Sequence, residues 1–322
     1  MCWICDAKTA SAPPGTAPMP TRASPWAPRR AFLLAVGAAA AAPADAQVNV
    51  GEASSLRNLV PAESLEQAAG QQYTEVLAKA RAQRALAPDN HPQLIRLRAI
   101  ANRLIPYAAQ WNPRARQWRW EVNLIGSKQL NAWCMPGGKI AFYTGILDQL
   151  KLSDDEVAMI MGHEMAHALR EHARERIAKT QATGLGLSVA ASLFGLGQLG
   201  DVGARLGTQL LTLKYSRDDE TEADLVGLEI AARAGFDPRA SISLWKKMMQ
   251  ASSSQGGNSF LSSHPSGPER IRALEVNVDR VQGLYEQARR GQASTAPVAR
   301  DPGPSGARPP FSTPVGQPLG AR

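Results

Sequence analysis

Cysteine is scarce in this chain, with three residues in 322. Cys2 and Cys5 form a C-x-x-C pair, a spacing that alone would indicate metal or redox chemistry. A secretion signal that starts at Met19 would have an ordinary basic beginning, so we interpret residues 1–18 as a stretch that is not translated. Cys134 is then the only cysteine left, which excludes an internal disulfide and leaves the fold to core packing and a metal ion.

The centre of the chain also lacks a charge imbalance. The formal net charge is +8, but residues 1–46 hold four basic and two acidic residues, and residues 287–322 hold five basic and one acidic. Of the 36 basic and 28 acidic residues in the chain, 27 and 25 therefore remain in the centre, a balance of +2. So small an excess provides no basic face for phosphate groups, and we exclude a nucleic-acid-binding protein.

No apolar run near the start is long enough to span a membrane. The segment PRRAFLLAVGAAAAAPADA has the order of a secretory signal, with two arginines, an apolar run and a small-x-small cleavage site at Ala44-Asp45-Ala46. We expect residues 1–46 to be an export segment and the mature chain to begin near Gln47, in the periplasm. The arginine pair also fits twin-arginine export, so the export route stays open.

Residues 183–200 form a second apolar stretch, with no charge over 18 residues. Five glycines, two serines and a glutamine lower its hydrophobicity, which favours a buried or surface-associated hairpin beside the functional site. Peripheral contact with a membrane is the alternative.

The remaining sequence predicts an α+β protein that is mainly helical. Apolar positions recur at helical spacing over residues 52–82 and 93–110, and again from residue 153 nearly to residue 289. These segments belong to one predicted domain, residues 47–289. After it, residues 290–322 are rich in proline and glycine, and we expect a disordered tail.

Three segments between the helices predict β-strands. Residues 116–125, 131–136 and 139–145 are rich in aromatic and branched side chains and are separated by short polar or glycine turns. We predict a small antiparallel sheet, with a free edge at the middle segment, which ends at Pro136.

The stretch MGHEMAHALREH, residues 161–172, carries the clearest chemical signal. Ser153 followed by three acidic residues predicts a helix start, which places His163 and His167 on one helical face, where they can hold one metal ion. A catalytic zinc takes three protein ligands and leaves one position for water. Glu164, beside the first histidine, can take a proton from that water. The spacing therefore predicts a catalytic metal site.

A third ligand is expected downstream, where residues 215–228 are rich in carboxylates. Glu220 and Asp224 lie four residues apart and would share a helix face, whereas Glu222 would point elsewhere. The helix dipole alone also favours acidic residues at a helix start. Spacing favours Glu220 over Glu222 without excluding either.

Together, GHEMAHALREH and SRDDETEAD resemble the family of zinc metalloproteases that includes HtpX, the CAAX prenyl endopeptidase, mitochondrial Oma and the periplasmic proteases BepA and LoiP. NAWCMPGGKIAFYTGIL is similar to the strand and turn of that family, and SSHPSGPERI to its His-Pro segment with a later Arg-Ile. The resemblance covers roughly residues 90–285, and we expect the periplasmic branch without a helical-repeat domain. Trp133 and Cys134 depart from the small residues of the family's strand, which concerns specificity rather than chemistry.

The resemblance implies a zincin-like fold in which an edge strand flanks the metal helix. It assigns roles to six residues: His163, His167 and Glu220 as ligands of one Zn²⁺ per chain, Glu164 as general base, Asp224 near the reacting oxygen or behind a ligand, and His264 at the site. His264 would either donate to the developing oxyanion or occupy the open metal position until substrate displaces it. Arg270 would orient a carboxylate or the loop.

Two other histidines and one strand complete the predictions. His172 lies five residues after His167 and is expected behind the site or at the surface, and His91 is expected to cap a helix or lie at the surface. The free backbone groups of Asn131, Ala132, Trp133 and Cys134 are expected to bind substrate, because an extended peptide can add to a sheet edge as a further strand.

The resulting hypothesis is zinc-assisted peptide hydrolysis. The resemblance and the export signal together imply substrates that are unfolded or misassembled envelope proteins, and contact with the membrane or the outer-membrane assembly machinery. The alternative is a periplasmic chaperone or assembly factor whose zinc site is structural or closed by His264.

Overall fold

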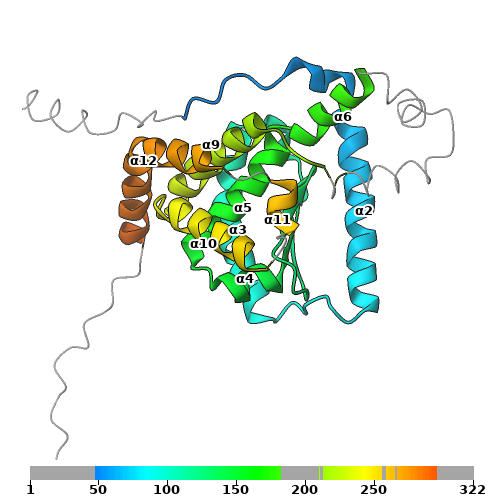
Figure 1. The fold of residues 1–322 in the computed structure, drawn as a ribbon, viewed down its shortest axis with the longest axis horizontal. Helices are drawn as coiled ribbons and strands as arrows, with labels where there is room; N and C mark the ends of the chain where they lie inside the picture. The colour runs from blue at the N-terminus through cyan, green and yellow to red at the C-terminus, as the bar shows by residue number, and fades with distance from the viewer. Residues whose placement is uncertain (1–47, 183–209, 211–212, 256–258, 265–266, 296–322) are drawn as a thin grey trace, which may run out of the picture. The chain divides into compact units, whose positions relative to one another are not determined.

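The computed structural model describes residues 48–182, 210, 213–255, 259–264 and 267–295 (Figure 1). The helices and strands follow in this order: η1 Ser55–Leu59, α2 Ala62–Ala82, α3 Pro92–Leu104, η2 Ile105–Gln110, η3 Pro113–Arg116, β1 Glu121–Ile125, β2 Ala132–Met135, β3 Lys139–Tyr143, α4 Thr144–Leu150, α5 Asp154–Leu169, α6 His172–Ala182, α9 Arg217–Arg233, α10 Ala240–Gln255, α11 Ser259–Ser263 and α12 Pro268–Thr295. A mainly helical α+β fold is confirmed. The export segment, the uncharged stretch 183–200 and the tail from residue 296 lie outside the described residues.

Prolines and a histidine set the limits of the first helices. α2 begins directly after Pro61, which stays extended. His91 caps α3, because its Nδ1 accepts a hydrogen bond from the N–H of Gln93 at 3.2 Å. A helix cap was one of the two positions predicted for His91. α3 gives way to the 3-10 helix η2 near Pro106, which has no N–H to donate to the preceding turn.

The sheet is mixed, so the prediction of a wholly antiparallel sheet was wrong. β2 and β3 form an antiparallel hairpin in which Cys134 lies opposite Ile140. Its turn contains Gly137 and Gly138, whose φ angles of 82° and 75° suit glycine. β1 pairs parallel with the other edge of β3, which gives the order β1-β3-β2. Composition indicates strands but does not decide which edge of a hairpin a third strand joins.

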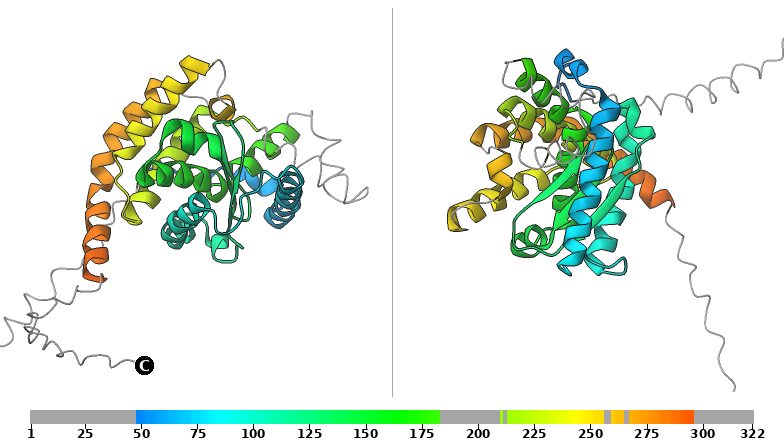
Figure 2. Two further views of the ribbon diagram at one scale, coloured as in Figure 1. Left: turned by 90° about the horizontal axis from the view of Figure 1, so that it is seen from below. Right: turned by 90° about the vertical axis from the view of Figure 1, so that its right-hand side faces the viewer.

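Alternate residues of β2 enter two different cores. Ala132 and Cys134 lie in the larger core, with residues of α3 and α5. Trp133 and Met135 lie in the smaller core, where the Trp133 ring meets Tyr73 of α2 at a centroid distance of 5.7 Å. The sheet thus lies between α2 on one face and α3 and α5 on the other (Figure 2). β2 is the outer strand of the described sheet and contacts α5, as predicted.

α5 lies in the middle of the fold. The Ser153 hydroxyl accepts a hydrogen bond from the N–H of Glu156, whose carboxylate accepts one from the N–H of Ser153, so the predicted serine cap is confirmed. Every residue from Glu156 to Leu169 is buried, because β2, α3, α9 and α10 all pack against this helix. The two histidines of α5 therefore face protein rather than solvent.

α5 and α9 cross in close contact at two glycines. A Cβ atom on Gly162 would lie 2.8 Å from the carbonyl oxygen of Gly227, and one on Gly227 would lie 2.6 Å from the backbone nitrogen of His163. Since these neighbours are backbone atoms, neither position has room for a side chain. The crossing thereby sets the distance between the histidines of α5 and the carboxylates of α9.

We expect Gly227→Ala to lower the free energy of unfolding by about 1–3 kcal/mol, as overpacking does, and to weaken metal binding because the two helices must separate. Urea unfolding and metal titration measure both effects. Gly283→Ala in α12 is the matched control, because a Cβ there would meet nothing within 4 Å. A Gly227→Ala chain as stable as the unmodified one would contradict this account of the crossing.

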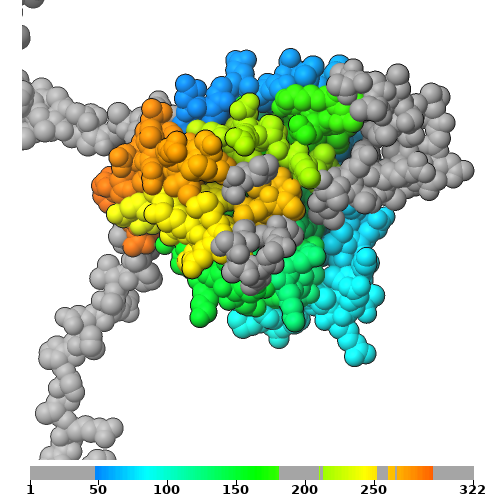
Figure 3. Space-filling model, in the orientation of Figure 1, coloured from blue at the N-terminus to red at the C-terminus, as the bar shows by residue number. Residues whose placement is uncertain are grey.

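The C-terminal helices cover the remaining sides of α5 and α9. α10 contacts α5, and α12 contacts α9 and α10; Figure 3 shows α10 and α12 side by side on one face, next to α11. α12 continues to Thr295, six residues beyond the predicted domain end at residue 289. Among the residues that the structure describes, none of the helices combines the length and apolar character that a membrane span requires.

Candidate metal centre

Two helices and a short loop bring four metal-binding side chains together. α5 supplies His163 and His167, α9 supplies Glu220, and His264 directly follows α11. One donor atom from each lies within 4.8 Å of the others, and all four side chains are buried. We call these residues the donor cluster. It contains the three ligands that the resemblance implied, with His264 as a fourth donor.

The spacing of the donor cluster fits a tetrahedral ion. The Nε2 atoms of His163 and His167 are 3.1 Å apart, and each lies 3.5 Å from an oxygen of Glu220. Nδ1 of His264 lies 3.3 Å from Nε2 of His163 and 2.9 Å from Oε1 of Glu220. Bonds of about 2.0–2.1 Å in a tetrahedron place ligand atoms about 3.3–3.4 Å apart. The donors are therefore arranged as ligands of one metal ion.

The two histidines of α5 have opposite pKa shifts. Burial lowers the pKa of His163, but hydrogen bonds with Asp224 and Glu220 outweigh burial and raise it to about 9. Burial holds the pKa of His167 well below its usual value, although Glu220 acts in the other direction. The carboxylates around His163 thus favour a positive charge at this position, and a metal ion can supply it in place of the proton.

Arg270 of α12 neutralises the carboxylates behind the donor cluster. Its guanidinium donates to Asp224 at 2.7 and 2.8 Å and lies 2.7 Å from Oε2 of Glu220. Burial raises the pKa of Asp224, but Arg270 and His163 together lower it below its usual value. Asp224 Oδ1 lies 3.0 Å from Nδ1 of His163. Of the two predicted positions for Asp224, the structure gives the one behind a ligand.

We expect Arg270→Leu to destabilise the metal-free chain by about 3–5 kcal/mol, because Asp224 and Glu220 would remain buried without their cation. Urea unfolding at neutral pH measures this. The matched control is Arg239→Leu, since Arg239 is 66% exposed in its ion pair with Asp237 and such pairs contribute about 0–1 kcal/mol. A loss below about 1 kcal/mol for Arg270→Leu would contradict this role.

Glu164 has the environment of a general base. Its carboxylate is buried, and burial raises its pKa above the usual value for glutamate. Oε1 has no hydrogen-bond partner among the described residues and lies 3.5 Å from Nε2 of His264. A buried carboxylate oxygen left free beside a metal site is suited to accept a proton from water.

A cleft of about 460 Å³ opens beside Glu164. Tyr215 and His264 line it, together with residues 131–136, which include the four residues predicted to bind substrate. The side chains of Ala132, Trp133 and Cys134 are buried in the two cores. Part of the backbone is already bonded, since the carbonyl of Asn131 accepts from the N–H of Tyr143 and the N–H of Ala132 donates to Oδ1 of Asn131. Burial also raises the pKa of the Cys134 thiol well above its usual value, which keeps it neutral and unreactive.

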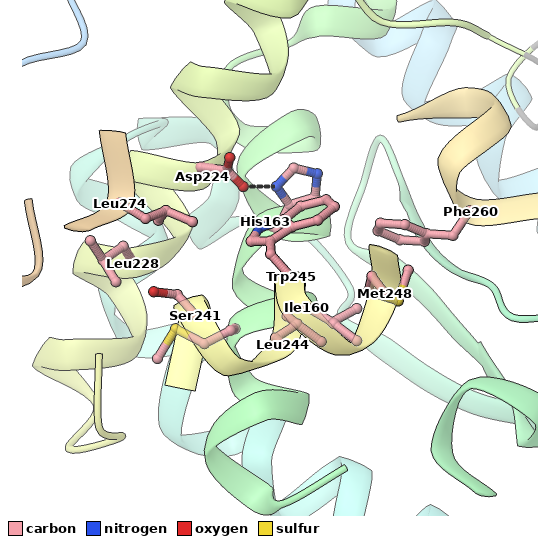
Figure 4. A pocket seen from close by; sticks show the side chains of 11 residues that line it. Ile160, His163, Asp224, Leu228, Ser241, Leu244, Trp245, Met248, Phe260 and Leu274 are labelled. Carbon is pink, nitrogen blue, oxygen red and sulfur yellow. Dashed lines mark hydrogen bonds and ion pairs between the residues drawn. The ribbon is translucent and has the colours of Figure 1, made fainter. Parts of the chain in front are cut away.

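A second pocket lies beside His163 and is mostly apolar. Figure 4 shows the ring of Trp245 next to His163, with Leu244, Met248 and Phe260 around them. The pocket is about 360 Å³, and Ser241 and Asp224 are among its few polar residues. Its composition suits an apolar group.

Several contacts of the site were not predicted from the sequence. The ring of Tyr215 stacks on His167 at a centroid distance of 3.9 Å, and the Arg270 guanidinium lies 3.8 Å from the centroid of the Trp245 ring. The position of Tyr215 directly before the serine cap of α9 is a sequence feature from which its place near the site could have been predicted. No feature of the sequence indicated that Trp245 lies at the site. His172 lies behind His167, one of the two predicted positions, and Glu222 points away from the donor cluster, as predicted.

Comparison with known protein families shows which family the chain belongs to. The model of peptidase family M48 matches residues 93–278, more than half of the chain. The chain belongs to peptidase family M48. This confirms the resemblance found in the sequence, and the matched M48 region contains β1, β2 and β3 and the whole donor cluster.

Individual proteins are similar to between about half and three fifths of the chain. Mitochondrial metalloendopeptidase OMA1 of Schizosaccharomyces pombe is 35% identical over 192 residues, which are 59% of this chain and 54% of that protein. Metalloprotease LoiP of Escherichia coli is 27% identical over 59% of this chain and 72% of its own length. The β-barrel assembly-enhancing protease of E. coli is 25% identical over 51% of this chain and 36% of its own length. The chain spans about half the length of the S. pombe protein.

Proposed function

We propose that this M48 protein is a zinc metalloendopeptidase that cleaves unfolded or misassembled exported proteins. The observation that carries the proposal is the buried Oε1 of Glu164, which has no hydrogen-bond partner among the described residues and lies 3.5 Å from His264 of the donor cluster, while Glu164 lines the cleft beside β2. A purely structural metal site needs no such base.

Zinc is the ion that best suits this donor set. Two imidazoles of one helix and a carboxylate of the next are ligands of catalytic zinc sites, and the donor spacing matches zinc bond lengths. When bound, zinc supplies a Lewis acid that polarises the peptide carbonyl and lowers the pKa of water toward about 7.

The residues of the chain carry the proton. Glu164 accepts a proton from the attacking water and returns it to the leaving amine, as its raised pKa and free oxygen favour. Asp224 holds His163 in the orientation that presents Nε2 to the ion. Arg270 pairs with both Asp224 and Glu220 in a buried site and, together with His163, lowers the pKa of Asp224.

The cleft favours extended, unfolded substrates. An extended peptide beside β2 would hydrogen bond to those backbone groups of residues 131–134 that do not pair with β3, and would pass Glu164, which lines the same cleft. Recognition through backbone groups tolerates many sequences, and the apolar pocket beside His163 would accept an apolar substrate side chain.

Casein cleavage by the purified chain, with and without a chelator, tests the activity. The proposal predicts cleavage that stops when zinc is removed and returns when zinc is restored. Cleavage that continues in the metal-free chain would contradict it.

His264 is proposed to keep the site closed until substrate displaces it, because its Nδ1 already lies among the other donors. We expect His264→Ala to speed casein cleavage by about tenfold, which corresponds to removing about 1.4 kcal/mol of bias toward the closed state. Initial rates at saturating zinc measure this. Slower cleavage would instead support the other role, donation to the developing oxyanion.

The location and partners are proposals that rest on the predicted export segment and on one relative. A periplasmic site of action agrees with a relative named for β-barrel assembly, whereas the OMA1 proteins are named as mitochondrial. Contact with outer-membrane assembly machinery is proposed on the same basis. The closing position of His264 also favours a second candidate, a chaperone that holds unfolded chains in the cleft without cutting them; it predicts casein binding without cleavage.

A further inference from the structure

The two ligand histidines of α5 are held from behind in different ways. Nδ1 of His163 lies against the carboxylate of Asp224 at 3.0 Å. Nδ1 of His167 instead lies 2.9 Å from Nδ1 of His172, a second imidazole. Nε2 of His172 lies 3.3 Å from Oε2 of Glu222, and Oε1 of Glu222 accepts a hydrogen bond from Nε of Arg170. Neither Asp224 nor any other carboxylate of the described site takes the place of His172 behind His167.

We propose that His172, Glu222 and Arg170 form a relay that fixes the tautomer and orientation of His167, and that the backbone carbonyl of Gly51 anchors the far end of this relay. The proposal rests on the metal site proposed above. It makes residues 48–51 a part of that site.

The hydrogen bonds of the relay are consistent with one placement of protons. If Nε2 of His167 binds the ion, its Nδ1 carries hydrogen and must donate to Nδ1 of His172. His172 then carries its hydrogen on Nε2 and donates to Glu222. Arg170 has only donors, and it donates to both Glu222 and Gly51. Each group therefore has one role, and the neutral ligand tautomer of His167 is selected.

Burial shields the inner part of the relay. His172 is 1% exposed and Arg170 is 9% exposed, while the side chain of Glu222 is 20% exposed and Gly51 lies at the surface. His172 begins α6 directly after the turn that follows α5, where Glu171 adopts a positive φ of 60°. This turn places the His172 ring behind His167, although the two residues are five positions apart in the sequence.

Residues 48–51 bridge α5 and α9, the two helices that carry the proposed ligands. Nη2 of Arg170, at the end of α5, donates to the carbonyl of Gly51 at 2.9 Å. Three residues earlier, the N–H of Val48 donates to Oε2 of Glu229 on α9 at 2.6 Å, and both of these residues are buried. Residues 48–51 are thus fastened to α5 at one end and to α9 at the other. The position of residues 48–51 is therefore linked to His167 through Arg170, Glu222 and His172.

Zinc affinity of the purified chain, measured by competition with a chelating dye, tests the relay. We expect His172→Leu to weaken zinc binding by about 10–100-fold, the usual cost of losing a group that orients a ligand. His172→Asn should restore most of the affinity, because its side-chain oxygen can accept from Nδ1 of His167. Thermal unfolding of the metal-free variants shows whether they are folded, and a purely structural role would predict no rescue by asparagine.

Two arginines provide a matched comparison for the far end. Arg170 pairs with Glu222 and donates to the carbonyl of Gly51, while Arg174 pairs with Glu171 and donates to the carbonyl of Val60. Both arginines therefore bind a backbone carbonyl that precedes α2. Only Glu222, the partner of Arg170, also contacts His172. We expect Arg170→Leu to weaken zinc binding by about tenfold and Arg174→Leu by no more than about twofold.

The outcomes separate the relay from the metal site itself. Equal effects of the two arginine substitutions, or unchanged affinity in His172→Leu, would overturn the relay while the metal site stands. An unmodified chain that binds no zinc would overturn the proposed function instead.

Discussion

Replacing Glu164 by glutamine is expected to lower kcat for casein cleavage by a factor of about 10²–10⁴ and to leave zinc affinity nearly unchanged. The amide has the shape of the carboxylate but cannot accept and return a proton. The result would assign the proton transfer to this carboxylate, whose buried Oε1 has no hydrogen-bond partner in the described structure. Steady-state kinetics and zinc content per chain, measured on the same preparation, check both parts.

The matched control is Glu156→Gln on the same helix. Glu156 is also buried, but it caps α5 and pairs with Lys247 at 2.7 Å rather than facing the cleft. This control should lower stability and leave kcat unchanged. Casein cleavage at the normal rate by Glu164→Gln would show that another group is the base.

Glu220→Ala is expected to weaken zinc binding by more than about 100-fold. Loss of a group that only orients a ligand weakens binding by about 10–100-fold, and here a direct ligand is removed. Activity should disappear at ordinary zinc concentrations. The fully buried carboxylate of Glu220 lies 3.5 Å from both histidines of α5 and also contacts Arg270 at 2.7 Å and His264 at 2.9 Å. Thermal unfolding of the metal-free variant therefore separates a loss of stability from the loss of a ligand. Zinc competition titration and casein cleavage over a range of zinc concentrations measure the effect.

Asp218→Ala is the control for Glu220. Asp218 lies in the same first turn of α9 but is exposed, so its loss should change zinc affinity little. If Glu220→Ala and Asp218→Ala bound zinc equally well, the carboxylate of α9 would not be a ligand.

Local signals were sufficient to predict most of the donor cluster. The i and i+4 spacing of His163 and His167 requires only a helix, and the Ser153 cap fixed where that helix starts. Glu220 was favoured over Glu222 for the same reason, since helical geometry separates the two side chains. In the structure, Glu220 lies among the donors and Glu222 contacts Arg170 and His172.

Long-range pairing was beyond what the sequence could predict. The parallel alignment of β1 with β3 depends on which edge of the hairpin is free, and neighbouring residues do not record this. The contact of Gly51 with Arg170 joins positions 119 residues apart. The extension of α12 to Thr295 also differed from our prediction, because composition changes gradually at that end whereas the helix continues to propagate.

The central claim is that one zinc ion is held by two imidazoles of α5 and a carboxylate of α9. A crystal structure of the purified chain, with anomalous diffraction recorded at the zinc edge, tests it most directly. We predict one anomalous peak per chain, bonded to Nε2 of His163, Nε2 of His167 and an oxygen of Glu220. Absence of the peak from zinc-supplemented crystals, or a peak away from Glu220, would contradict the account.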